Sequence, residues 1–235
     1  MTRVKACVVI PCFNHATTLA EVAVAARAHC RTLVVDDGSD EPLARPPGCA
    51  MIRLERNCGK GAALAAGFKR AATLGFTHAI TMDADGQHFA EDLPRFLAAA
   101  RAQPQALVVG VRDFGAAQCP AGRRRSNWLS SLGFCVETGV WLEDSQCGFR
   151  CYPLALTRRL RTRAGHFAFE SEFLTRAAWV GTKLVALPVR CSYAAPQLRQ
   201  SQFHPVWDFA QVTITKVGLA AQSWTAPRSW RAAWS

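Results

Sequence analysis

Short apolar runs alternate with helical patterns along the chain, and this alternation restricts its fold more than any other feature. The apolar runs cover residues 6–10, 33–35, 51–54, 77–80, 106–110 and 183–189. Between the first two runs, Leu19, Val22, Ala23 and Ala26 lie at helical spacing. We expect Thr17 or Thr18 to cap that helix. A continuous apolar run is typical of a strand covered on both faces. The chain is therefore predicted to be an α/β layered sandwich around a mostly parallel sheet.

The composition favours a folded protein with anionic partners. The chain has 235 residues, half of them hydrophobic, and a net charge of +11. This charge favours nucleotide phosphates, acidic lipid headgroups or nucleic acid as partners. The sequence has no helix-turn-helix, RRM or zinc-finger pattern, so we expect no nucleic-acid partner.

Ten scattered cysteines form no Cys-x-x-Cys pair, and no signal-peptide pattern precedes the first apolar run. We therefore expect free thiols in a reducing cytosol and no zinc site. The longest apolar candidate, residues 128–142, is interrupted by Glu137. No membrane-spanning helix is predicted from this pattern.

Two carboxylates, Asp83 and Asp85, follow the apolar run at 77–80 and precede Gly86. Open α/β sheets bind ligands at the carboxyl ends of their strands. Mg²⁺ and Mn²⁺ prefer oxygen ligands, and proteins commonly hold them with one or two carboxylates plus the phosphates of a substrate. Asp83, Asp85 and Gln87 are therefore candidate ligands for Mg²⁺ or Mn²⁺. The alternative is an ordinary solvated Asp-Gly turn.

A second candidate site for an anion lies where a helix opens with Gly59, Lys60 and Gly61. Free backbone N–H groups at a helix start, together with an ammonium group, favour an anion. The segment is not a Walker A loop, because no Ser or Thr follows Lys60.

The chain resembles family 2 glycosyltransferases, and within them the dolichol- and polyprenyl-phosphate sugar synthases and their bacterial relatives. The resemblance rests on five segments in order: 8–14 (VVIPCFN), 34–39 (VVDDGS), 57–61 (NCGKG), 82–87 (MDADGQ) and 144–150 (DSQCGFR). It implies a GT-A fold, a three-layer sandwich whose mostly parallel sheet is mixed. One domain would cover residues 1–204, with a nucleotide-binding half at about 1–112 and an acceptor half at about 113–204. A C-terminal helix and tail would follow at 205–235.

The resemblance also implies roles for individual residues. The nucleotide-sugar site would comprise Pro11, Phe13, Asn14, Val35, Asp37, Lys60, Asp83 and Ala84. The catalytic set would comprise Asp85, Arg112, Arg125, Asp144 and Glu172, and the acceptor set Gln146, Gly148, Arg150 and Arg199.

Several of these assignments have alternatives in the sequence. One of Asp36 and Asp37 is expected only to form an Asx turn. Guanidinium groups suit phosphate oxygens, and we expect one or two of the arginines at 123–125 to touch substrate. Glu170 serves either the site or the dipole of its own helix.

Together these residues predict an inverting glycosyltransferase that uses a nucleotide-sugar donor. A lipid acceptor such as polyprenyl phosphate is already ionised and needs no general base. A hydroxyl acceptor, on a lipid or a soluble molecule, would need one, with Glu172 and Asp144 as candidates. A non-catalytic membrane-associated module is the third alternative. Oligomeric state is left open.

The tail carries tryptophans between basic residues, which suits a bilayer interface. These residues are Trp207, Trp224, Trp230, Trp234, Lys216, Arg228 and Arg231. A helix packed on its own domain is an alternative for residues 207–219. The expectation is a cytoplasmic enzyme that is peripheral on the inner face of a membrane.

Overall fold

The fold is taken from a computed structural model of the chain. It describes residues 3–115, 119–160, 162, 168–193, 215, 217–219 and 221. Arg199 and the tail tryptophans lie outside the described residues, and so does the proposed domain boundary at residue 204.

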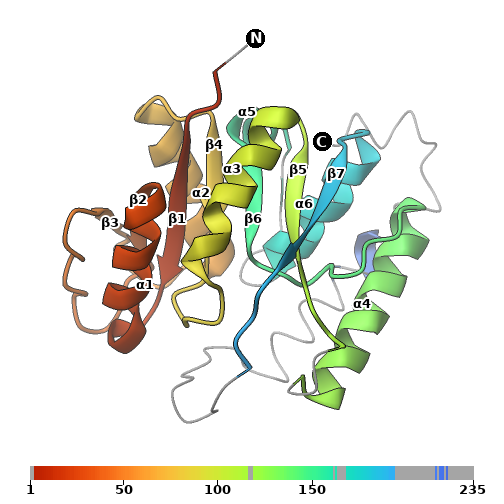
Figure 1. Ribbon diagram of the computed structural model, residues 1–235, viewed down its shortest axis with the longest axis horizontal. Coiled ribbons are helices and arrows are strands. Elements are labelled where there is room, and N and C mark those ends of the chain that lie inside the picture. Colours follow the sequence, from red (N-terminus) through yellow and green to blue (C-terminus); the bar gives the residue numbers. More distant parts are fainter. Residues whose placement is uncertain are drawn as a thin grey trace.

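The described residues form one seven-stranded sheet in the order β3-β2-β1-β4-β6-β5-β7 (Figure 1). The strands are β1 (Ala6–Cys12), β2 (Arg31–Asp36), β3 (Ala50–Arg53), β4 (His78–Thr81), β5 (Leu107–Arg112), β6 (Arg150–Pro153) and β7 (Leu184–Val189). Only β6 runs antiparallel, to both β4 and β5. The mostly parallel mixed sheet predicted from the sequence is confirmed.

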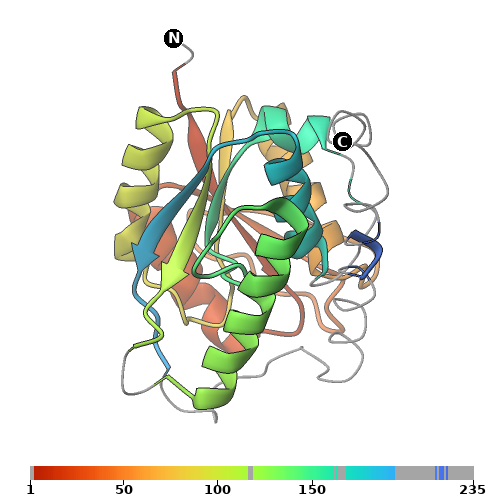
Figure 2. The same ribbon diagram turned by 90° about the vertical axis from the view of Figure 1, so that its right-hand side faces the viewer.

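Helices cover both faces of this sheet, as Figures 1 and 2 show. On one face lie α1 (Ala16–His29) and α3 (Leu93–Ala102), which follows the 3₁₀ turn η1 (Ala90–Asp92). On the other lie α2 (Lys60–Thr73), α5 (Leu154–Arg159) and α6 (Ala168–Trp179). The helix α4 (Ala121–Thr138) packs beside α6, at the margin of the three layers. The three-layer α/β sandwich is confirmed.

Alternate residues of β1 serve the two halves of the core. Cys7 and Val9 pack with α2 and α6, whereas Val8 and Ile10 pack with α1 and α3. This two-residue alternation on a strand buried on both faces explains the continuous apolar run in the sequence. A Cβ on Gly67 would lie 2.5 Å from the Val9 side chain, so this glycine lets α2 approach the sheet closely.

Some element boundaries differ from the sequence prediction. The helix α1 begins at Ala16, after His15, and no side chain caps it. The predicted cap by Thr17 or Thr18 is wrong, because the Thr18 hydroxyl donates instead to the Ala84 carbonyl at 2.6 Å. Arg112 is the last residue of β5 rather than a residue beyond it.

All ten cysteines are free thiols. Six are buried, three are half-buried, and Cys58 is exposed. Burial raises the pKa of Cys7, Cys12 and Cys147 to about 12. Among the described residues, no helix has both the length and the apolar character needed to cross a membrane.

Candidate active site

The order in which strands are added to the sheet reverses beside β1, and the candidate residues lie at this point. The chain goes from β1 to β2 and β3 on one side, then returns to place β4 on the other side of β1. Ligands of open α/β sheets bind at the carboxyl ends of strands at such a switch point. Asn14 follows β1, Asp37 follows β2 and Asp83 follows β4, so all three lie at this edge.

A compact charged cluster joins β4 to two helices at this edge. The Lys60 ammonium, at the start of α2, lies 2.7 Å from Asp83 Oδ1 and 2.9 Å from Glu170 Oε2 on α6. Burial alone would raise the pKa of Asp83, but the charges of Lys60, His88 and Arg112 and the hydrogen bond from Lys60 together hold that pKa below the ordinary value. Asp83 is therefore an ionised acceptor at neutral pH.

Gly148 lies at the centre of this cluster. A Cβ at this position would lie 2.9 Å from Asp83 Oδ2 and 3.1 Å from both Glu170 Oε1 and Lys60 Nζ. The absence of a side chain therefore makes the space in which the three charged groups meet. The structure brings Lys60 and Asp83, both expected in the nucleotide-sugar site, next to Gly148, which was expected in the acceptor site, and adds Glu170 to them.

Arg150 has a different place from the one predicted. It is completely buried, and its guanidinium donates to the carbonyls of Cys147 (2.7 Å), Glu170 (2.7 Å) and Ser145 (2.9 Å). These bonds tie the segment before β6 to the start of α6. The predicted acceptor contact is corrected here: Arg150 positions Gly148 and Glu170, and its side chain does not reach the surface.

The second carboxylate, Asp85, faces a separate group of polar side chains. The Gln87 side-chain amide donates to Asp85, and the side-chain oxygen Oε1 of Gln87 accepts a 2.9 Å hydrogen bond from Arg123. Both ends of the Gln87 amide therefore have partners within the site, and its place among the metal ligands stays a prediction. Arg123, not the exposed Arg125, is the arginine of its run that reaches the carboxylate turn.

His88 is buried directly after the turn that carries Asp83 and Asp85. Its ring lies 5.0 Å from the Phe149 ring, centroid to centroid, and its Nδ1 is buried with no hydrogen-bond partner. Burial lowers the pKa of His88 below its ordinary value, although the Asp83 charge opposes that change. The sequence analysis assigned His88 no role.

Arg112 and Asp144 form a bidentate pair beside the cluster. Arg112 Nε lies 2.6 Å from Asp144 Oδ2, and its Nη2 lies 2.9 Å from Oδ1. Asp144 is completely buried. With both oxygens bound to a guanidinium, Asp144 is not available as a general base. It fixes the orientation of Arg112 instead.

Glu172 does not face the site either. It is buried, and its Oε1 accepts a 2.7 Å hydrogen bond from Arg176. Residues two apart on a helix point in directions about 200° apart, so Glu170 and Glu172 cannot serve the same site. The predicted general base Glu172 is corrected to Glu170 as the glutamate that meets Asp83 and Lys60.

The nucleotide loop predicted after β1 is joined to the loop after β2. Asn14 adopts a left-handed φ of 52°, its side-chain amide donates to Asp40 at 2.8 Å and its backbone N–H donates to Ser39 at 2.9 Å. Asp36 has the local structural role of the two aspartates, because it accepts the Ser39 N–H at 2.9 Å, although this bond spans three residues rather than the two of an Asx turn. Asp37 accepts the Cys58 N–H at 3.0 Å, which joins it to the segment that begins α2.

The remaining residues of the predicted nucleotide set contribute less surface. Val35 is completely buried and packs in the core beneath α2, so its side chain cannot contact a nucleotide in this structure. Pro11 pairs with Val35 inside the sheet, and Phe13 is half-buried. Ala84 contributes its carbonyl, which holds Thr18 of α1. Gln146 donates a 3.3 Å hydrogen bond to Ser126 on α4.

The donor atoms at Asp83 and Asp85 suit a hard divalent cation. In the part of the chain that the structure describes, no three His, Cys, Asp or Glu side chains converge as a preformed metal site. Glu170 Oε1 is buried with no hydrogen-bond partner and lies against the same space as Asp83. Carboxylate oxygens of this kind fit Mg²⁺ or Mn²⁺ when substrate phosphates complete the coordination.

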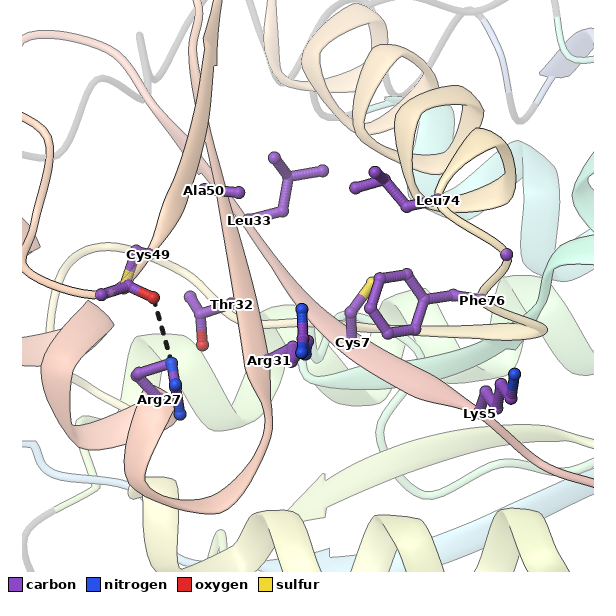
Figure 3. Close-up of a pocket in the computed structure, with 12 residues that line it drawn as sticks. Lys5, Cys7, Arg27, Arg31, Thr32, Leu33, Cys49, Ala50, Leu74 and Phe76 are labelled. Carbon is purple, nitrogen blue, oxygen red and sulfur yellow. Dashed lines mark hydrogen bonds between the residues drawn. The ribbon is translucent and has the colours of Figure 1, made fainter.

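A separate cavity of about 530 Å³ lies at the opposite edge of the sheet (Figure 3). It opens where β1, β2 and β3 begin, between Lys5, Arg27 and Arg31. Arg27 Nε donates to the Gly48 carbonyl at 3.0 Å. Because these strands are parallel, their first residues lie at the other edge from Asp83. This cavity has no part in the site described above.

Comparison with known proteins agrees with the geometry. Residues 7–163 match the model of glycosyl transferase family 2. The chain belongs to this family. An undecaprenyl-phosphate mannosyltransferase of Micrococcus luteus is 30% identical over 205 residues, which cover 81% of this chain and 83% of that protein. A polyprenol monophosphomannose synthase of Mycolicibacterium smegmatis is 29% identical over 206 residues, which cover 77% of this chain and 75% of that protein. This family 2 glycosyltransferase is therefore related to polyprenyl-phosphate sugar transferases.

Solved structures support the fold of the family. Mannosyl-3-phosphoglycerate synthase from Rubrobacter xylanophilus aligns with a TM-score of 0.64 at 16% identity, over 97% of this chain and 80% of that one. S. aureus TarS in complex with UDP-GlcNAc aligns with a TM-score of 0.55 at 15% identity, over 97% of this chain and 69% of that one. At these identities the likeness concerns the GT-A-like α/β fold alone.

Proposed function

We propose that this chain is an inverting glycosyltransferase that moves a sugar from a nucleotide-sugar donor to polyprenyl phosphate with Mg²⁺ or Mn²⁺. The observation that carries the proposal is the charged cluster at the switch point, where Asp83 meets Lys60 and Glu170 around Gly148. The names of the related lipid-phosphate sugar transferases support the acceptor class.

The roles of the residues follow from their positions. Asp37 and Asn14 lie at the edge where a nucleoside would bind, and the carboxylate of Asp37 can accept bonds from a base or ribose. Asp83 and Asp85 would hold the metal, which supplies Lewis-acid stabilisation of the departing diphosphate. Lys60 and Arg112 contribute fixed positive charge beside the same phosphates. Asp144 keeps the Arg112 fork in one orientation.

Removal of the second carboxylate tests the proposal. Asp85→Asn should abolish metal-dependent sugar transfer, because the metal would lose one of its two protein carboxylates. The thermal midpoint should stay the same, since Asp85 is half-buried in a turn rather than packed in the core. Glu21→Gln, at an exposed carboxylate of α1, is the matched control. Wild-type transfer by Asp85→Asn, with the same metal dependence, would overturn the metal assignment.

A second candidate function is transfer to a hydroxyl acceptor with Glu170 as general base. The unpartnered buried Oε1 of Glu170 favours it. In that case Glu170→Gln should lower the turnover rate by about 10² to 10⁴ with donor binding unchanged. An ionised phosphate acceptor needs no base, so the rate should then change only modestly. The size of the drop decides between the two acceptors.

We also propose that residues 1–204 act as one catalytic domain and that the enzyme works at the inner, cytoplasmic face of a membrane. A lipid acceptor and the net charge of +11 support this location. Peripheral contact through the tryptophans of the tail is part of the same proposal.

A further inference from the structure

The outward face of α4 is apolar from Trp128 to Val136, after the basic first turns of the helix. We call Trp128, Leu129, Leu132 and Val136 the outer stripe. Their exposed fractions are 55%, 61%, 39% and 59%, and spacings of three and four residues place them on one side of the helix. Val140 and Trp141, exposed by 39% and 53%, extend the apolar surface just past the helix end.

The inward face of α4 is more polar than the outward face. Asn127 and Ser131 are buried there, and Asn127 donates to the Glu143 carbonyl at 2.7 Å. Glu137 is also buried and accepts a 2.9 Å hydrogen bond from Thr175 of α6. Phe134 is the large apolar residue on this side. A surface helix normally turns its apolar side to the core, so the reversal indicates that the outer stripe meets an apolar environment beyond the part of the chain that the structure describes.

The helix α4 exposes basic side chains and no acidic side chain. Arg123, Arg124 and Arg125 lie within the first turns of α4, which contain no acidic residue. The only acidic residue of the helix is Glu137, which is buried. Tryptophans with neighbouring cations suit the boundary between lipid headgroups and acyl chains, and a helix that exposes no carboxylate is complementary to anionic lipids, although Glu143 is exposed just past Trp141.

We propose that the outer stripe of α4 docks on the surface of an anionic membrane. The inference deepens the proposed function, because it rests on a lipid acceptor and names the surface from which that acceptor is reached. The Arg123 guanidinium joins α4 to Gln87, next to Asp85. Figures 1 and 2 show α4 at the margin of the layers, where no other described element covers its outward side. Docking there brings the carboxylate turn to the lipid headgroups.

The test is co-sedimentation of the full chain with vesicles of equal parts phosphatidylcholine and phosphatidylglycerol. Leu129→Gln/Val136→Gln should weaken binding at least tenfold, because it removes apolar area from the outer stripe. Val24→Gln/Leu74→Gln is the matched control, with one leucine and one valine that are 47% and 46% exposed elsewhere. Binding by this control should equal that of the wild type, and both variants should keep the wild-type thermal midpoint.

Two results would overturn the proposal. One is wild-type vesicle binding by the α4 variant together with loss of binding by Trp224→Ser/Trp230→Ser/Trp234→Ser, which would assign the contact to the tail. The other is a change in sedimenting mass with vesicle binding intact, which would make the outer stripe an interface between two copies.

A parallel assay separates this inference from the proposed function. The α4 variant should still transfer sugar to a short-chain polyprenyl phosphate dispersed in detergent, while transfer to the same lipid in vesicles falls. Wild-type protein that binds vesicles but transfers to neither form would refute the proposed acceptor and leave the docking surface standing.

Discussion

At the scale of single residues, neighbouring side chains of the same type have different roles, and the phase of a helix decides between them. The sequence Phe169-Glu170-Ser171-Glu172 offers two glutamates, and only the rotation of α6 shows that Glu170 faces the site. In the same way, Arg123 and Arg125 are equivalent in the sequence but differ by 200° around α4. The sequence pointed to Glu172 and Arg125, whereas the structure turns Glu170 and Arg123 toward the site, because the rotation of a helix is set by tertiary packing.

The place of Gly148 leads to a prediction about activity. Gly148→Ala adds a Cβ at 2.9 Å from Asp83 Oδ2, so the carboxylate or the ammonium beside it must move. A displacement of this size at a reacting centre lowers rates by up to about 10²-fold. Sugar transfer should fall by about that factor while the circular dichroism spectrum stays the same. Gly122→Ala, where nothing lies within 4 Å of the new Cβ, should keep full activity. Equal activity in the two variants would show that the cluster tolerates the methyl group.

Asp36 should make folding stability depend on pH. Burial would raise the pKa of Asp36, but its bonds to Ser39 and Arg53 lower it below the ordinary value. The folded pKa thus lies below the unfolded one, so the stabilisation is present above about pH 4 and is lost as pH falls through the folded pKa. Asp36→Asn should cost about 1–3 kcal/mol at pH 7, measured by urea unfolding.

The same comparison at low pH completes the test. The difference between wild type and Asp36→Asn should shrink below about pH 4. Glu41→Gln, at an exposed carboxylate, should show no such difference at either pH. A pH-independent difference for Asp36→Asn would show that its hydrogen-bond geometry matters and its charge does not.

At the scale of elements, the ends of the parallel strands were predicted to within one or two residues, because a strand buried on both faces has a continuous apolar run in its sequence. The antiparallel strand β6 was not predicted. Its four residues, Arg150–Pro153, contain no apolar run, and they become a strand only by pairing with β4 and β5. Such pairing between distant segments has no local signal in the sequence.

Arg150 should determine how firmly β6 and α6 are held together. Arg150→Met leaves three buried carbonyls without their donor, each at a cost of about 1–3 kcal/mol. We expect the free energy of unfolding to fall by at least about 3 kcal/mol in urea titrations. Arg158→Met, at an exposed position of α5, should stay within about 0.5 kcal/mol of wild type. A loss below 1 kcal/mol for Arg150→Met would mean that water reaches these carbonyls.

At the scale of the whole molecule, strands from both expected halves lie in one sheet. The carboxyl ends of β1 and β4 therefore meet the segment before β6 in one site. The order β1-β4-β6 puts Asp83 next to Gly148, which is 65 positions later in the chain. The motif order in the sequence located this edge, because parallel strands share a carboxyl end. The contact between Glu170 and Lys60 depends on how α2 packs against α6, and no sequence motif predicts this packing.

The burial of the cysteines makes the chain a natural single-site chemical probe. Cys58 is the one exposed cysteine, and its N–H donates to Asp37 at the predicted nucleotide edge. Burial raises the pKa of Cys7 and Cys12 and suppresses their thiolates. A maleimide should label Cys58 at least tenfold faster than any other thiol, and Cys58→Ser should remove that fast phase in mass spectra. A bound nucleotide-sugar should slow the labelling, and EDTA should restore the rate. Alkylation kinetics can therefore rank UDP-, GDP- and dTDP-sugars on the unmodified protein, before any acceptor is known.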